Sequence, residues 1–275
     1  MNLAAIFPDE DYRFAMRFER RAPEEFFTPQ PGTSLRLDER RRWLDESAAD
    51  YAALAPQGQP LLAEMFQMLQ GWPGTQPSVP SSDPSLASCI ELGKRLDTDF
   101  LLVRPDSAGS FRLEGGCVCF PSSWSLPEKM GSTLEEIHGV VPGLNPALSR
   151  PISGFLAKLA PDIAWLRANW GLSRSPELNQ HPHRGLPRLD AAVGANDVWV
   201  RIEHQALVAL PCTKGVLFGI RIEVIPLPEM CGNPSAASGL WRALETMPEA
   251  VAAYKGIAAA RPRLIELLRA GLANP

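Results

Sequence analysis

The sequence predicts an α+β fold, in which an antiparallel sheet carries helices on one face. Residues 198–210 and 215–226 alternate apolar with polar side chains and are joined by Pro-Cys-Thr-Lys-Gly, a hairpin-type turn. Residues 100–104 and 111–120 form a second pair of predicted strands, separated by Pro-Asp-Ser-Ala-Gly. The flanking segments instead place apolar residues at helical spacing, which completes the α+β pattern.

The N-terminal part of the chain is predicted to hold three helices. They are expected over 38–47, 60–71 and 85–96, the second on the spacing of its apolar residues. Residues 71–84 are rich in Gly, Pro and Ser and are expected to form a loop.

The segments on either side of the two long strands are also predicted from their patterns. A short helix is expected over 128–138, and a long helix over 145–170 with Pro161 near its middle. Residues 171–196 are polar and aperiodic, which indicates a loop. The last forty or so residues carry apolar stripes typical of helices. These stripes are Leu240, Leu244 and Met247, then Leu264, Leu267 and Leu268.

Length and composition fit one structural unit with a sizeable core. The chain has 275 residues, of which 45% are hydrophobic and 21% charged. We expect an N-terminal helical and loop extension over 1–98, a sheet core over 99–228 and C-terminal helices over 229–275.

Composition also argues against several classes of protein. A net charge of −4 without a basic patch argues against nucleic-acid binding. No apolar run reaches the roughly 18 residues of a membrane span. Pro8, Asp9 and Glu10 interrupt the segment in which a signal peptide needs an apolar run. Five irregularly spaced cysteines favour a reducing compartment, so a cytoplasmic location is expected, and Cys117 and Cys119 are expected to pack in the core.

The histidines are the remaining candidates for chemistry, because no P-loop, dinucleotide fingerprint or zinc-protease motif is present. His138 follows the apolar stripe of Leu134 and Ile137 and precedes Gly139, a residue suited to ending a helix. Its imidazole has two open interpretations. It is either a metal or haem ligand facing an apolar cavity, or a charged group favoured by the helix dipole.

His204 is the one strongly polar residue on an apolar strand face, so it needs a partner there. A haem propionate, a haem iron and a backbone carbonyl are the three alternatives. His181 and His183 lie in the predicted polar loop and are therefore expected to be solvated. A His-x-His pair can bind a metal, but no third ligand lies nearby in the sequence.

Four ordered blocks of the sequence resemble the alpha subunit of haem-dependent oxidative N-demethylases, the dimethylamine-monooxygenase type. A weaker likeness covers Asp11-Tyr-Arg-Phe-Ala-Met-Arg. The four blocks are Cys119-Phe-Pro-Ser-Ser-Trp-Ser-Leu-Pro-Glu-Lys-Met-Gly, Ile137-His-Gly-Val-Val-Pro-Gly-Leu-Asn, Arg167-Ala-Asn-Trp-Gly-Leu, and Arg201-Ile-Glu-His-Gln-Ala-Leu-Val-Ala-Leu-Pro with Gly215-Val-Leu-Phe-Gly-Ile-Arg-Ile.

The resemblance implies a PAS-like sheet that binds haem b. Because the sequence has no C-x-x-C-H attachment motif, the haem is expected to be bound non-covalently. It implies oxidative N-demethylation of a small secondary amine such as dimethylamine, with oxygen and with electrons from NADPH through a partner reductase. It makes His138 the iron ligand, and it places Arg201 and His204 at the haem propionates or in the distal pocket.

The chain departs from the family pattern at two positions of one block. His204 stands where the family usually has arginine, and Ala206 stands where it has threonine. An arginine fork suits a propionate better than an imidazole does. These departures favour an alternative function, a haem-binding sensor or carrier without turnover. A haem-free subunit of an assembly is the third hypothesis.

Overall fold

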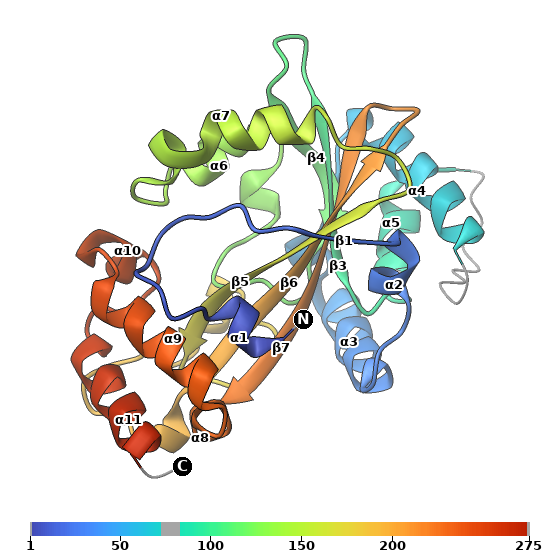
Figure 1. The fold of residues 1–275 in the computed structure, drawn as a ribbon. Coiled ribbons are helices and arrows are strands. Elements are labelled where there is room, and N and C mark those ends of the chain that lie inside the picture. Colours follow the sequence, from blue (N-terminus) through green and yellow to red (C-terminus); the bar gives the residue numbers. More distant parts are fainter. Residues whose placement is uncertain (1, 73–82, 274–275) are drawn as a thin grey trace.

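A seven-stranded antiparallel sheet forms the centre of the molecule (Figure 1). The computed structural model describes residues 2–72 and 83–273. Across the described sheet the strands follow the order β1-β5-β6-β7-β3-β4-β2. Their bounds are β1 (Glu19–Arg21), β2 (Ala52–Leu54), β3 (Asp99–Pro105), β4 (Phe111–Cys117), β5 (Ala164–Ser173), β6 (Trp199–Leu210) and β7 (Gly215–Pro226). The predicted α+β class is confirmed.

Eleven α-helices surround the sheet within the described residues. They are α1 (Leu3–Ile6), α2 (Pro23–Phe27), α3 (Thr33–Tyr51), α4 (Gln59–Gly71), α5 (Leu86–Gly93), α6 (Leu134–His138), α7 (Leu144–Leu156), α8 (Leu227–Cys231), α9 (Pro234–Thr246), α10 (Glu249–Tyr254) and α11 (Arg261–Ala273). The three N-terminal helices expected from the sequence are present as α3, α4 and α5. Of the predicted loop over 71–84, residues 73–82 lie outside the described part. No helix in the described ranges is long and apolar enough to cross a bilayer.

The strand register decides which side chains share a face of the sheet. Trp165 of β5 is paired with Leu207 of β6, which in turn is paired with Phe218 of β7, so these three lie on one face, here called the Trp165 face. Gly219 belongs to the opposite face, here called the Gly219 face. Phe155 of α7 contacts Trp165 with ring centroids 5.2 Å apart, so α7 covers the first face.

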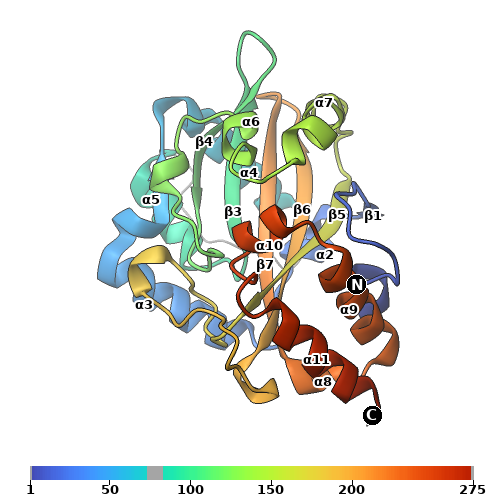
Figure 2. The same cartoon turned by 90° about the vertical axis from the view of Figure 1, so that its left-hand side faces the viewer.

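The Gly219 face is covered by helices from both ends of the chain. The rings of Phe26 and Phe27 in α2 lie directly against Gly219. Near the other end of the strands, Val200 and Ile202 form a second apolar core with the C-terminal helices. Figure 2 shows α8, α9 and α11 grouped at one end of the sheet and α6 with α7 at the other. The sequence predicted helices on one face of the sheet only, whereas the structure also places α7 on the second face.

The helix predicted over 145–170 is wrong in its second half. The chain leaves α7 after Leu156, turns at Asp162 with φ 60°, and continues as β5. The helix ends before Pro161 is reached, and ten residues of β5 then pair with β6. The helix expected over 128–138 is also shorter than predicted. Gly131 adopts φ 75°, so α6 begins only at Leu134.

Substitution of Gly219 tests the packing of α2 on the sheet. A Cβ at this position would lie 2.8 Å from ring atoms of Phe26 and of Phe27. We expect Gly219→Val to lower the free energy of unfolding by about 1–3 kcal/mol, through overpacking. Gly171→Val is the matched control, because a Cβ there meets no atom within 4 Å. Equal urea midpoints for the two variants would contradict this packing.

Candidate functional site

His138 lies at the C-terminal end of α6, a helix fixed by a capping box. The Thr133 hydroxyl accepts a hydrogen bond from the Glu136 amide at 3.1 Å, and the Glu136 carboxylate accepts one from the Thr133 amide at 2.7 Å. Burial lowers the pKa of His138, and the charge of Arg167 lowers it further. Neither ring nitrogen forms a hydrogen bond with a residue of the described chain. A neutral imidazole with a lone pair available is the form that ligates iron, which weighs against the charged interpretation.

Arg167 projects from β5 on the Trp165 face, where it is paired in register with Gln205. It is half-buried, and burial lowers the pKa of its guanidinium while the charge of Glu203 opposes that shift. Within the described residues the guanidinium of Arg167 forms no hydrogen bond and no ion pair. A charged guanidinium without a partner is suited to binding a carboxylate. Arg167 was not predicted as a site residue because a helix was expected over 145–170. The alternation of apolar and polar side chains over 164–173 is the signal that would have indicated a strand here.

Arg201 is buried and fully engaged by the protein itself. Its Nη2 donates to the backbone carbonyls of Phe120 and Leu178, both at 2.7 Å, and its Nε donates to the Ser122 hydroxyl at 2.8 Å. Burial lowers its pKa to about 10. Arg201 therefore holds two loops against β6, and contact with a propionate would require some of these bonds to break.

Glu203 is the acidic centre of the Trp165 face. Its carboxylate accepts hydrogen bonds from the Ser122 hydroxyl at 2.6 Å, from Gln205 Nε2 at 2.9 Å and from Asn169 Nδ2 at 3.3 Å. Because Ser122 also accepts from Arg201, the network runs from the buried guanidinium to this carboxylate. Sequence reasoning missed Glu203 and Asn169, which acquire their setting only from the pairing of β5 with β6.

His204 projects from the opposite face of the sheet. It is paired in register with Ala168 and Arg221, and its Nε2 lies 2.7 Å from a carboxylate oxygen of Glu223. A carboxylate on the neighbouring strand is thus its partner in the structure. The sheet separates His204 from His138, so the two side chains do not meet.

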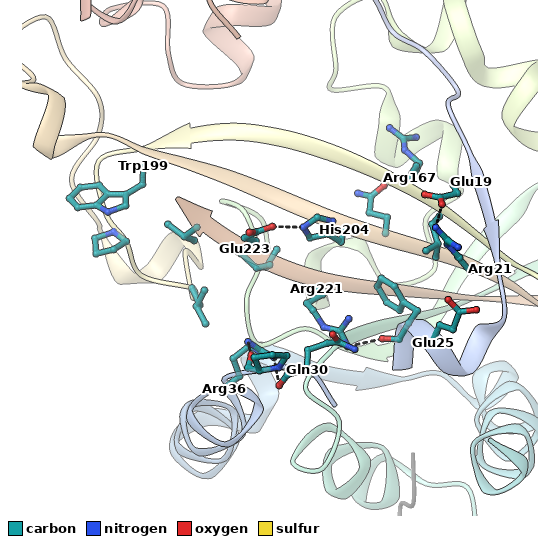
Figure 3. A pocket seen from close by; sticks show the side chains of 18 of the residues that line it. Glu19, Arg21, Glu25, Gln30, Arg36, Arg167, Trp199, His204, Arg221 and Glu223 are labelled. Atoms are coloured by element: carbon teal, nitrogen blue, oxygen red, sulfur yellow. Dashed lines mark hydrogen bonds and ion pairs between the residues drawn. The ribbon is translucent and has the colours of Figure 1, made fainter. Parts of the chain in front are cut away.

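A cavity of about 860 Å³ is lined by His204 and by groups from β1, β5, β6 and β7 (Figure 3). Figure 3 shows the His204–Glu223 pair in its middle, with Arg167 near Glu19 and Arg21 at one end and Trp199 at the other. His138 is not among its lining residues. The cationic groups on this side are largely paired, since Arg36 and Arg221 both bind Asp97, at 2.7 and 3.0 Å.

Several apolar side chains of the Trp165 face and of the helices that cover it are only partly buried. On the sheet these are Leu207 and Phe218, and on the covering helices Ile137 and Ile152. Half-buried apolar surface on both sides of one interface is suited to a flat apolar ligand. His138 and Arg167 thus supply a half-buried imidazole and an unpaired guanidinium, groups of the kind that ligate a haem iron and bind a carboxylate.

The remaining histidines and the cysteines form no metal centre. His181 is buried, in contrast to the expected solvation, and its ring lies 4.1 Å from that of the exposed His183. Cys117 and Cys119 are buried with their sulfurs 3.9 Å apart, which confirms a packing role. Across residues 2–72 and 83–273, no three His, Cys, Asp or Glu side chains are placed to hold a metal ion.

A family model described as "Haem-dependent oxidative N-demethylase, alpha subunit-like" matches residues 74–265. The match covers more than half of the chain and includes β3 to β7. His138, Arg167, Glu203 and Lys255 all lie within it.

The His204–Glu223 pair predicts a pH-dependent contribution to stability. The hydrogen bond from His204 lowers the pKa of Glu223 in the folded protein. The pair's contribution is therefore present above the unfolded value of about 4.3, and it is lost as the pH falls through the lower folded value. We expect Glu223→Gln to be less stable than the wild type at pH 7. Urea titrations of both proteins should show the difference shrinking towards pH 3, and a constant difference would contradict the pair's role.

Proposed function

Since this chain belongs to the haem-dependent oxidative N-demethylase, alpha subunit-like family, we propose that it is a haem-dependent monooxygenase that demethylates a small secondary amine such as dimethylamine. We further propose that it holds haem b on His138, against the Trp165 face of a PAS-like sheet. Membership in an alpha-subunit family implies a partner subunit. We propose a reductase that draws on NADPH as a partner, and the cytoplasm as the location.

The observation that carries this proposal is the state of His138. It is a half-buried imidazole whose pKa is lowered by burial, with no hydrogen-bond partner in the described chain. Imidazoles at helix ends usually gain from being protonated, because the helix dipole favours a cation there. Here burial and the nearby charge of Arg167 oppose protonation of His138, so its lone pair remains available to ligate a metal.

The other groups of this face would prepare the site. When bound, the haem would supply oxygen activation, with the oxidised methyl group leaving as formaldehyde. Leu207 and Phe218 would exclude water from the macrocycle face, which strengthens the electrostatic effects of nearby groups. Glu203, fixed by Ser122, Asn169 and Gln205, would hold a negative charge near Arg167.

Arg201 and His204 take indirect roles in this proposal. Arg201 would fix the loops at Phe120 and Leu178 on which the shape of the site depends. A haem iron is normally ligated through Nε2, because Nδ1 lies close to the backbone and is crowded by it. The Nε2 of His204 is engaged by Glu223, so iron ligation there would require this bond to break.

The second candidate function is a haem-binding sensor or carrier without turnover. The engaged His204 and the methyl group of Ala206, where the family has arginine and threonine, favour it. Both functions require haem, whereas a haem-free subunit of an assembly would show no Soret absorption.

Replacement of His138 tests the ligand. We expect the wild-type protein to bind haemin with a Soret band and to release it into acidified butanone. His138→Ala should weaken haem retention by about tenfold or more, since the proposed iron ligand is lost, and imidazole should partly restore the ferric spectrum. His204→Ala is the matched control and should leave the Soret position unchanged. If His138→Ala kept full haem occupancy and an unaltered spectrum, another residue would have to be the iron ligand.

Turnover separates the two haem-binding functions. With NADPH and a reductase, the haem-loaded protein should release formaldehyde from dimethylamine at a rate that depends on the enzyme concentration. Haem binding without formaldehyde from dimethylamine or related secondary amines would favour the sensor or carrier.

A further inference from the structure

A second cavity, of about 160 Å³, lies at the outer edge of β5, against the N-terminal segment and α9. Strand β1 pairs with β5 only at Ala164–Leu166, so from Arg167 onwards the described chain places no strand on that edge. The lining includes the cationic groups of Arg167 and Lys255 and the amide of Asn169. It is therefore a small polar space next to the proposed haem face.

Lys255 enters this cavity without an acidic partner. Its Nζ donates to the backbone carbonyl of Trp170 at 2.7 Å and lies 5.0 Å from the centre of the Trp170 ring. No carboxylate of the described residues lies within ion-pair distance of it. Burial lowers its pKa to about 8, with the charge of Glu203 opposing and that of Arg167 adding to the shift.

The acidic groups that line the same cavity already have partners. Glu10 is bound by Arg13 and Arg17, both at 2.7 Å, and Asp11 is bound by Arg242 at 2.7 Å. The carboxylate of Glu203, whose charge acts on Lys255 from outside the lining, accepts three hydrogen bonds from other side chains. Two half-buried cations thus repel one another with no acid paired to either, an arrangement that an anion would stabilise.

We propose that Arg167 and Lys255 together bind one carboxylate in this cavity. A guanidinium fork and an ammonium group are the usual pair of donors for such an anion. The inference rests on the proposed function in one respect, because the carboxylate has two sources. It belongs either to a haem propionate or to a free substrate that is an N-methyl amino acid, which is a secondary amine with a carboxylate.

The volume fits either source. A cavity of about 160 Å³ admits one propionate arm, or a whole molecule of N-methylglycine, but not a macrocycle. If the carboxylate is the substrate's, dimethylamine lacks the group that this cavity recognises. The substrate class would then be N-methyl amino acids.

Two titrations of the full chain separate the sources. In the first, haemin and haemin dimethyl ester are titrated and followed by Soret absorption. In the second, N-methylglycine and dimethylamine are titrated by calorimetry. Both are repeated with Arg167→Gln, Lys255→Met and the control Arg13→Gln, which removes a cation of the same cavity that is already paired with Glu10. Thermal unfolding checks that each variant folds, and either of the two test variants suffices.

A propionate source predicts that the ester binds the wild type and Arg13→Gln about tenfold more weakly than haemin does, since a charged hydrogen bond is lost. This difference should disappear in Arg167→Gln and in Lys255→Met. A substrate source predicts instead that N-methylglycine binds more tightly than dimethylamine, and that either substitution weakens its binding by about tenfold.

The proposal is overturned if esterification has no effect and if N-methylglycine either does not bind or binds all variants equally. Failure of both porphyrins to bind would refute the proposed haem function alone. In that case the N-methylglycine titration still decides whether this cavity binds a carboxylate.

Discussion

The register between β5 and β6 is the constraint on which the site depends. Ten residues of each strand are paired, and side chains alternate between the two faces. A one-residue slip of β5 would move Arg167 to the Gly219 face, and a one-residue slip of β6 would move His204 to the Trp165 face. The buried Arg201 guards against this, because its guanidinium would lose three carbonyl and hydroxyl partners if the strand moved. An unsatisfied buried guanidinium is among the most costly defects in a protein core, so this one residue holds both the register and the loops.

The two faces of the sheet differ in how completely their charges are balanced. On the Gly219 face, His204 is matched by Glu223, and Arg36 and Arg221 share Asp97. On the Trp165 face and along the outer edge of β5, Arg167 and Lys255 have no paired acid in the described chain. Structural ion pairs stabilise a fold without leaving groups for a ligand, whereas unbalanced charges cost stability unless a ligand compensates them. This difference, more than cavity volume, distinguishes the face suited to binding.

Much of the fold could be predicted from local sequence patterns, whereas the site could be predicted only in part. The first of the two strands around 198–226 alternates over residues 199–205, and a two-strand hairpin needs no distant information, so both strands were predicted. Strand β5 was not, because its residues also satisfy a helical spacing, and only pairing with β6 selects the strand. The residues at helical spacing are Leu159, Ile163, Leu166 and Trp170. Because β5 was not predicted, the position of Arg167 on the Trp165 face was not predicted either. Glu223 as the partner of His204 likewise follows from cross-strand register, which no single segment encodes.

The position of His138 could be predicted because the helix end that carries it is locally encoded. Its protonation state could not, since that depends on burial by distant strands and on the charge of Arg167. These two effects act together at the site. Burial lowers the pKa of His138 and the charge of Arg167 lowers it further, and the same guanidinium remains available to an anion. The bound anion would in turn reduce the field that Arg167 exerts on His138, and the imidazole would become the more basic donor. Binding of a carboxylate at the edge of β5 would therefore act on the pKa of His138 through the charge of a single side chain, Arg167.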